Sequence, residues 1–358
     1  MPHSAMPTGK TVTTGPVGVT RFEEFGHIRI GLTLEEFGAL GFTFGDSVDA
    51  AFSNGKRLED IPCYSGYYTA PGNPQVCGYP GYTHPVIARN YGAPAWDEFG
   101  LAEGDTVTVT LREKGKYLQI QQLFSLKYSN DRKDFPSDAV FSNFRELRGG
   151  DMKAGRVFRS ASPCDNQYLR AACTDRLIKA HGIRFALNLS DSEQRYAEHA
   201  AAPDFSSPYY EALYRDGKVM LLPVNADYRS GAFAKALAEG LRAMAEHEGP
   251  CLIHCTEGKD RTGFACAPVL ALAGAQPEEI LDDYMVTFGN YYGITRESDP
   301  ERYEAIRQGA TDFLRCLCGA EKGSVPETRD LRAGAEACLR RGGLDDESIA
   351  RIRARLTE

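Results

Sequence analysis

A short apolar run, followed directly by a glycine-containing loop and a helix-like stretch, is the feature that most restricts how this chain can fold. Residues 250–254 predict a buried strand, and a helix is expected to begin near Arg261. Residues 184–189 predict another strand, and residues 232–247 carry apolar side chains at helical spacing. Residues 327–356 predict two further helices. Strands that alternate with helices indicate an α/β fold in which a parallel sheet is flanked by helices.

The chain has 358 residues, which is too long for most single hydrophobic cores, so two domains are expected. Residues 47–55 partly alternate polar and apolar side chains and end in a Ser-Asn-Gly hairpin turn signal. Residues 105–111 alternate as a half-buried strand does. We therefore expect a small, mostly β domain over residues 26–125, before an α/β domain over residues 126–358. Residues 1–25 begin with a stretch rich in Pro, Gly, Thr and Val and are expected to be a flexible tail.

The loop between the strand and the helix contains residue types suited to phosphate chemistry. Its sequence is His254-Cys255-Thr256-Glu257-Gly258-Lys259-Asp260-Arg261-Thr262-Gly263. Backbone N–H groups at a helix N-terminus are unpaired and attract an anion, and a tight loop can aim several of them at one point. The same field stabilises a thiolate, so we expect Cys255 to be a nucleophile near neutral pH. Arg261 can hold two phosphate oxygens with its planar guanidinium, and Gly258 permits backbone conformations closed to other residues. The Thr262 hydroxyl can hydrogen-bond the thiolate as it leaves.

The spacing of Cys255 and Arg261 is weak evidence when taken alone, because Cys164 and Arg170 have the same separation. This other pair has no glycine between its members, no histidine before the cysteine, and Pro163 instead of a strand in front. We interpret it as a coincidence. The pair of Cys255 and Arg261 has the glycine, the preceding histidine and the strand in front, so we interpret it as a phosphate-binding catalytic loop rather than a buried structural cysteine.

The loop resembles that of the bacterial atypical tyrosine and dual-specificity phosphatases. These are related to secreted mycobacterial and listerial enzymes that also act on phosphoinositides. Residues 143–150, 157–161 and 282–285 resemble three further segments of that family, the last being a helix that packs behind the loop. The resemblance covers about residues 135–358. It implies a cysteine-dependent phosphatase domain that hydrolyses phosphomonoesters through a cysteinyl-phosphate intermediate, without metal or cofactor.

The leaving oxygen of such a reaction needs a proton from a general acid. The resemblance implies Asp260, whose alternative role is to order the loop. Asp227 follows an apolar strand, where other cysteine phosphatases keep a movable acid, and its alternative is a solvated loop aspartate. Asp191 is the third candidate. The chain has Asn188 where the family often has aspartate, which weakens any role carried over to that position.

Five residues are expected to contact the substrate: Thr256, Glu257, Gly258, Lys259 and Thr262. Lys259 adds positive charge, which favours a substrate with more than one phosphate, such as a phosphoinositide, unless its side chain is only solvated. Glu257 opposes that idea because it adds negative charge.

Four residues near the loop have supporting roles or none. We expect His254 to order the loop rather than titrate. Arg159 either braces the loop or lies at the surface. Cys251 and Cys266 are expected to be buried thiols, the alternative being a disulfide that protects the nucleophile.

Composition restricts the partners. The formal net charge is −8 and no long basic block occurs, which argues against nucleic acid. No apolar run approaches the ~18 residues of a membrane span. The start has no apolar segment typical of a signal peptide. We expect a cytoplasmic protein from the sequence as printed, and a secreted or lipid-anchored one if a leader was removed.

The favoured function is a protein tyrosine or dual-specificity phosphatase acting on a phosphorylated protein. One alternative is a phosphoinositide or inositol-phosphate phosphatase that uses the same loop. Another is a module that binds a phosphorylated ligand without turnover, against which the intact Cys255 argues. A third is that the first domain does the work and binds a nucleoside or peptide through its tyrosines.

Overall fold

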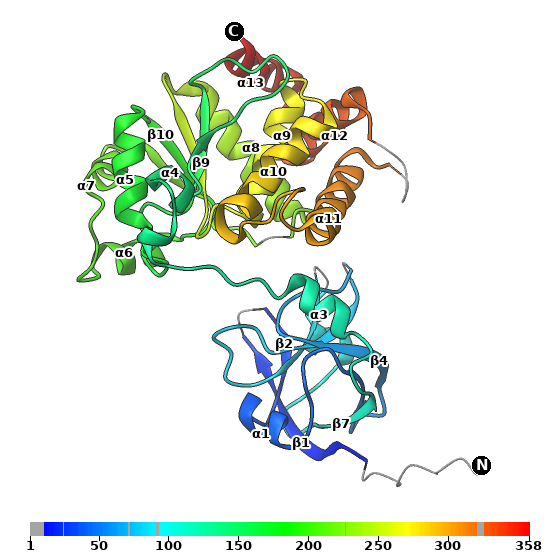
Figure 1. The fold of residues 1–358 in the computed structure, drawn as a ribbon. Helices are drawn as coiled ribbons and strands as arrows, with labels where there is room; N and C mark the ends of the chain where they lie inside the picture. Colours follow the sequence, from blue (N-terminus) through cyan, green and yellow to red (C-terminus); the bar gives the residue numbers. More distant parts are fainter. Residues whose placement is uncertain (1–10, 24, 71, 91–92, 226, 321–325) are drawn as a thin grey trace. The chain divides into compact units, whose positions relative to one another are not determined.

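The structure is a computed structural model that describes residues 11–23, 25–70, 72–90, 93–225, 227–320 and 326–358. The chain divides into two compact units, Met1–Leu126 and Lys127–Glu358. The first unit is built mainly of strands and the second of strands and helices (Figure 1). This confirms the coarser prediction of an α/β fold preceded by a small β domain.

The first unit is a barrel. Its strands are β1 (Thr13–Phe22), β2 (His27–Ile30), β3 (Ser47–Phe52), β4 (Arg57–Tyr64), β5 (Pro74–Cys77), β6 (Val86–Arg89) and β7 (Thr106–Glu113). Its helices are α1 (Leu34–Ala39), α2 (Ala95–Phe99) and α3 (Leu118–Phe124). Within the described residues the strands close in the order β1-β2-β6-β5-β4-β3-β7. Strands β4 and β5 pair in parallel, and the other neighbours pair antiparallel.

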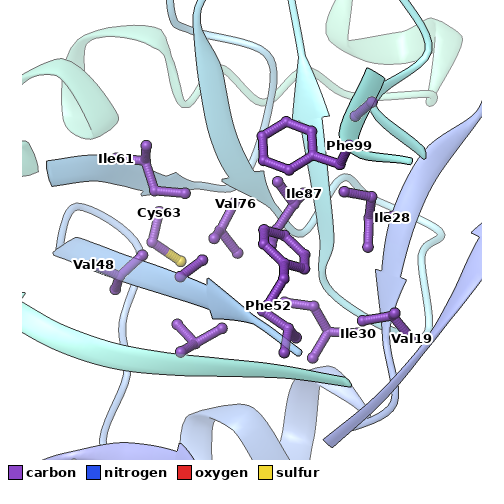
Figure 2. Packing of buried hydrophobic residues seen from close by; sticks show 14 of the residues in the cluster. Val19, Ile28, Ile30, Val48, Phe52, Ile61, Cys63, Val76, Ile87 and Phe99 are labelled. Carbon is purple, nitrogen blue, oxygen red and sulfur yellow. The ribbon is translucent and has the colours of Figure 1, made fainter. Parts of the chain in front are cut away.

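Side chains that alternate along the strands fill the barrel. Val48 and Phe52 of β3 belong to the same apolar core as Ile28 and Ile30 of β2, with Val48 near Cys63 and Phe52 near Ile30 (Figure 2). Each such side chain contributes about 1.5–3 kcal/mol when it leaves water. The predicted hairpin is confirmed as β3 and β4, and the predicted strand at 105–111 is confirmed as β7.

The predicted flexible tail is wrong for residues 13–22, which form β1 and pair with β2 and β7. Val17 and Val19 pack toward the barrel core, which outweighs the Pro and Gly content of this stretch. Pro16 is accommodated because the pairing with β7 shifts register between Thr13 and Pro16, where a missing N–H costs little. The part of the prediction on residues 1–10 and 24 lies outside the described residues.

The second unit contains a five-stranded sheet within the described residues, in the order β11-β10-β12-β9-β8. Its strands are β8 (Arg145–Glu146), β9 (Val157–Ser160), β10 (Phe185–Asn188), β11 (Val219–Leu221) and β12 (Cys251–His254). Strands β9 to β12 pair in parallel, whereas β8 pairs antiparallel with β9, so the sheet is mixed.

The helical segments of the second unit are η1 (Arg132–Asp134), α4 (Asp138–Phe141), α5 (Ala171–Ala180), α6 (Glu193–Ala200), α7 (Pro208–Arg215), α8 (Gly231–Glu246), α9 (Asp260–Leu272), α10 (Pro277–Tyr292), α11 (Pro300–Cys318), α12 (Thr328–Arg341) and α13 (Asp346–Thr357). None of the helices in the described part of the chain combines the length and the apolar character that a membrane span requires.

The central strands of the sheet begin with apolar residues and end in polar ones, which are Ser160, Asn188 and His254. Every residue of β9, β10 and β12 is buried. Helices α5, α6 and α7 contribute Ile178, Tyr196 and Tyr210 to a cluster with Phe158 and Leu252 of the sheet. Parallel strands end at one edge of a sheet, so the residues that follow β9, β10 and β12 are brought together there. That edge carries the candidate site.

Candidate active site

The predicted catalytic loop lies where β12 ends and α9 begins. Cys255 is the first residue after β12 and only 3% of its surface is exposed. Helix α9 starts at Asp260, with Lys259 as the residue before it. The helix therefore begins one residue earlier than expected. Its free N–H groups and positive dipole end lie beside the cysteine, as an anion site requires.

Gly258 allows the loop to pack tightly against the end of β9. Its φ is +66°, in the left-handed region that favours glycine. A Cβ at this position would lie 2.1 Å from the Ser160 carbonyl oxygen. No other residue fits here without moving the loop or the strand.

Two side chains brace the loop by donating hydrogen bonds to the Gly258 carbonyl oxygen. Arg159 Nη2 lies 2.8 Å from this oxygen, and Asn143 Nδ2 lies 3.0 Å from it. Arg159 is completely buried, which excludes the surface role considered above. Its Nη1 is 2.5 Å from Asp283 Oδ2. The three segments quoted for the resemblance therefore meet at this loop.

A buried charge cluster supports that brace. The Asp283 carboxylate also accepts from Arg145 Nε at 2.8 Å. Burial alone would raise the pKa of Asp283, but the guanidinium groups of Arg145 and Arg159 lower it below its ordinary value. Two guanidinium groups and one carboxylate leave a net positive charge behind the loop, which favours an anion in front of it.

The two remaining loop residues predicted to act on phosphate, Arg261 and Thr262, differ in their hydrogen bonding. Arg261 donates to Thr256 Oγ1 at 3.1 Å and to the Leu189 carbonyl oxygen at 3.5 Å. The Thr262 hydroxyl is buried and has no hydrogen-bond partner among the described residues. Burying a hydroxyl without a hydrogen-bond partner costs free energy. The Thr262 hydroxyl can therefore form a hydrogen bond with the Cys255 sulfur or with a ligand.

His254 is held in a buried hydrogen-bond network. Its Nε2 lies 2.7 Å from the Tyr210 hydroxyl, which accepts from Asn188 Nδ2 at 3.3 Å. Burial lowers the pKa of His254 to about 4, although the Asp191 charge opposes the change. The imidazole is therefore neutral near pH 7, which favours an ordering role over titration in catalysis.

Acidification is expected to destabilise the second unit through His254. Its folded pKa lies below the ordinary value of 6.5, so the unfolded chain binds more protons between pH 6.5 and 4, and stability falls as the pH falls through this window. We expect this residue to contribute a loss of about 2 kcal/mol between pH 7.5 and 4.5. Urea unfolding at both pH values would measure it. In the His254→Gln variant, whose amide can also hydrogen-bond the Tyr210 hydroxyl, the loss should be smaller by that amount. An equal loss would contradict the assignment to His254.

The candidate acids lie in three different settings. Asp260 is 41% exposed at its side chain and forms an ion pair with Lys259 at 2.8 Å. Asp227 begins the turn before α8, where its Oδ1 accepts from the backbone of Arg229 at 3.2 Å. Asp191 is almost completely buried, and its Oδ2 accepts from Asn188 Nδ2 at 2.8 Å. This bonding favours a structural role for Asp191.

Glu257 and Lys259 make contacts that the sequence did not predict. The ion pair with Asp260 and an 18% exposed side chain rule out a merely solvated Lys259. The Tyr128 hydroxyl donates to Glu257 Oε1, and the Tyr291 hydroxyl donates to the Glu257 carbonyl oxygen at 2.7 Å. Two isolated tyrosines carry no local pattern, so only the folded chain reveals them.

The other cysteines have structural environments. Cys164 donates to Asp191 at 3.3 Å, and Arg170 is buried among aromatic rings, so the second Cys–Arg pair forms no phosphate loop. All ten cysteines lie in described residues and are free. Burial raises the pKa of Cys251 to about 11 and that of Cys266 to about 12, which makes these thiols unreactive.

A strand, a glycine-bearing cysteine loop and a helix that begins beside an arginine follow one another here, as the sequence predicted for a phosphate-binding loop. A model of the tyrosine phosphatase family matches residues 139–358, so the chain belongs to this family.

Named relatives and a solved structure cover parts of the chain. A tyrosine-protein phosphatase of Nostoc commune is 28% identical over 122 residues, which are 32% of this chain and 42% of the relative. A protein of Cupriavidus necator named as a candidate tyrosine-protein phosphatase is 26% identical over 178 residues, 43% of this chain and 63% of the relative. This chain thus spans less than two thirds of either relative. The crystal structure of P. aeruginosa TpbA matches 55% of this chain and 91% of its own, with 19% identity and a TM-score of 0.29.

Proposed function

We propose that this chain is a cysteine-dependent phosphatase. The observation that carries the proposal is the loop of residues 255–261, in which the buried Cys255 follows β12 and Arg261 lies in the first turn of α9. The parallel strands with helices on both faces are the scaffold that we assign to this phosphatase domain. The buried pair of Arg159 and Asp283 keeps the loop in position before the substrate arrives.

The reaction has two steps. The Cys255 sulfur attacks the phosphorus, so an S–P bond forms and the bond to the leaving oxygen breaks while a general acid supplies its proton. Arg261 and the loop amides hold the phosphoryl oxygens, whose charge they stabilise. Water then attacks the phosphorus and gives a proton to the carboxylate that acted as the general acid in the first step. The S–P bond breaks, inorganic phosphate is released, and the Thr262 hydroxyl stabilises the departing thiolate. No step requires a metal.

A phosphorylated protein, with phosphate on tyrosine, is the substrate that we favour. The family and the names of both relatives support this choice. A phosphoinositide remains the alternative. Lys259 was the sequence argument for a substrate with more than one phosphate. Asp260 partly neutralises the positive charge of this side chain, which weakens that argument.

The proposal is tested by turnover of para-nitrophenyl phosphate in the reduced, intact chain with EDTA present. We expect steady release of para-nitrophenol without added metal, because Arg261 and the loop amides supply the positive charge. Phosphotyrosyl peptide and phosphoinositide substrates would then be compared side by side. An intact chain that cleaves none of the three would overturn the proposed activity and favour a binding role.

Replacing the general acid should slow the release of a poor leaving group more than that of a good one. We propose Asp260 for this role and expect Asp260→Asn to reduce kcat for phenyl phosphate by about 10²-fold or more, with a smaller effect on para-nitrophenyl phosphate. Steady-state kinetics with both esters would measure the difference. Asp227→Asn is the matched control, and a leaving-group effect in that variant instead would move the acid to Asp227.

A further inference from the structure

The segment that opens the second unit, residues 127–131, contacts the phosphate loop directly. Tyr128 in this segment donates a hydrogen bond from its hydroxyl to Glu257 Oε1. Tyr128 precedes residues 139–358, which are the residues that the family model matches. One partner of this contact therefore lies outside the residues that the family model matches.

Tyr128 packs against an aromatic ring and a buried guanidinium. Its ring stacks on Tyr291 at 5.1 Å between centroids, and the Arg170 guanidinium lies 4.9 Å from the Tyr128 ring and 4.8 Å from the Tyr291 ring. Arg170 also donates to the Ser129 carbonyl oxygen at 3.1 Å and to Asn130 Oδ1 at 2.9 Å. A buried guanidinium that bonds carbonyls and stacks on ring faces fixes the backbone that follows Tyr128.

Glu257 creates an electrostatic problem that this contact solves. A carboxylate within a loop that binds a phosphate dianion repels the ligand when the two approach each other. Burial and the nearby Glu257 charge raise the pKa of Tyr128 above its ordinary value, so its hydroxyl keeps the proton that it donates. The Tyr291 hydroxyl holds the carbonyl oxygen of the same residue. Side chain and backbone of Glu257 are thus both fixed by the stacked tyrosines.

We propose that Tyr128 is a positioning residue of the phosphate loop. Its hydroxyl binds the Glu257 carboxylate, keeps this charge directed away from bound phosphate, and holds the loop amides in the conformation that receives the phosphate. This inference deepens the proposed phosphatase function and rests on it. It extends the working part of the site to the segment before the family's matched residues.

A double-mutant cycle in the intact, reduced chain tests this role. The variants are Tyr128→Phe, Glu257→Gln and the double variant. For each we would measure kcat and KM with para-nitrophenyl phosphate, and the inorganic phosphate concentration that half-protects Cys255 from iodoacetamide. We expect Tyr128→Phe to raise KM and the half-protecting concentration about 10-fold, with kcat changed less than about 2-fold, because a charge-assisted hydrogen bond is lost and the carboxylate is released.

The second arm of the cycle separates positioning from simple packing. Glu257→Gln should lower the half-protecting phosphate concentration, and Tyr128→Phe should change it less than about 2-fold in that background, because no charge is left to release. Tyr209→Phe is the matched control, since it removes a tyrosine hydroxyl bond to the distant Ile183 carbonyl oxygen.

An equal effect of Tyr128→Phe with and without the Glu257 charge, or no effect in either background, would overturn the proposal. Failure of the phosphatase function is distinguishable from this. An intact chain without turnover, in which phosphate still protects Cys255 and the cycle still shows coupling, would reject catalysis and retain the positioning role. Turnover in the intact chain, combined with additive effects of the two substitutions, would retain catalysis and reject the positioning role of Tyr128.

Discussion

Turnover of para-nitrophenyl phosphate should fall by about 10⁴-fold or more in the Cys255→Ser variant, because the nucleophile forms the covalent intermediate. A serine hydroxyl is a much weaker nucleophile, because it keeps its proton near neutral pH. The residual site would still bind phosphate through Arg261 and the loop amides. Release of para-nitrophenol with EDTA and reductant present would measure the loss.

The matched control for this substitution is Cys316→Ser, which alters an exposed cysteine of α11. Its rate should stay close to that of the unaltered chain. A Cys255→Ser variant that retains a substantial rate would reject cysteine-based chemistry, whichever residue then carried the reaction.

Asp283→Asn should lower the free energy of unfolding of the second unit by about 3–5 kcal/mol, because it removes one partner of a buried ion-pair cluster. Asparagine has nearly the same shape, but it leaves the guanidinium groups of Arg145 and Arg159 buried without a counter-charge. Arg159 would also hold the Gly258 carbonyl oxygen less firmly, so turnover should fall with stability. Urea unfolding followed by circular dichroism would measure the change.

Asp282→Asn provides the control, since Asp282 is the exposed neighbour of Asp283 on α10. Surface substitutions of this kind usually change stability by less than about 0.5 kcal/mol. If both variants unfolded at the same urea concentration, the cluster would contribute nothing to stability and its role as a brace would be wrong.

Several elements of the second unit could be predicted because their patterns are local. The apolar run at 250–254 became β12, and the helical spacing at 232–247 became α8. The two helices predicted for 327–356 are α12 and α13. In each case neighbouring residues determine which face is apolar, so no distant contact is needed to recognise the element.

The prediction of a flexible tail failed for the opposite reason. Gly15, Pro16 and Gly18 weaken the local strand signal in β1. Pairing with both β2 and β7 supplies the missing stabilisation, and strand pairing is a property of distant segments.

The candidate nucleophile and its arginine were predicted from the sequence, but their support was not. Asn143 and Arg159 reach the loop from the regions of β8 and β9, and Asp283 of α10 holds Arg159, although these segments lie far apart in the chain. Tyr128 carries no motif at all, yet its hydroxyl meets Glu257. Identical spacing also proved a poor guide, because Arg170 of the second Cys–Arg pair packs among aromatic rings.

The sequence alone determined that a cysteine and an arginine flank a tight loop at a helix N-terminus, because strand, glycine and helix signals follow one another within a few residues. Only the tertiary structure decided which charges surround that loop. Ion pairs and hydrogen bonds depend on distances of a few ångströms between residues that the sheet and helices bring together, and such distances are not encoded in any local pattern.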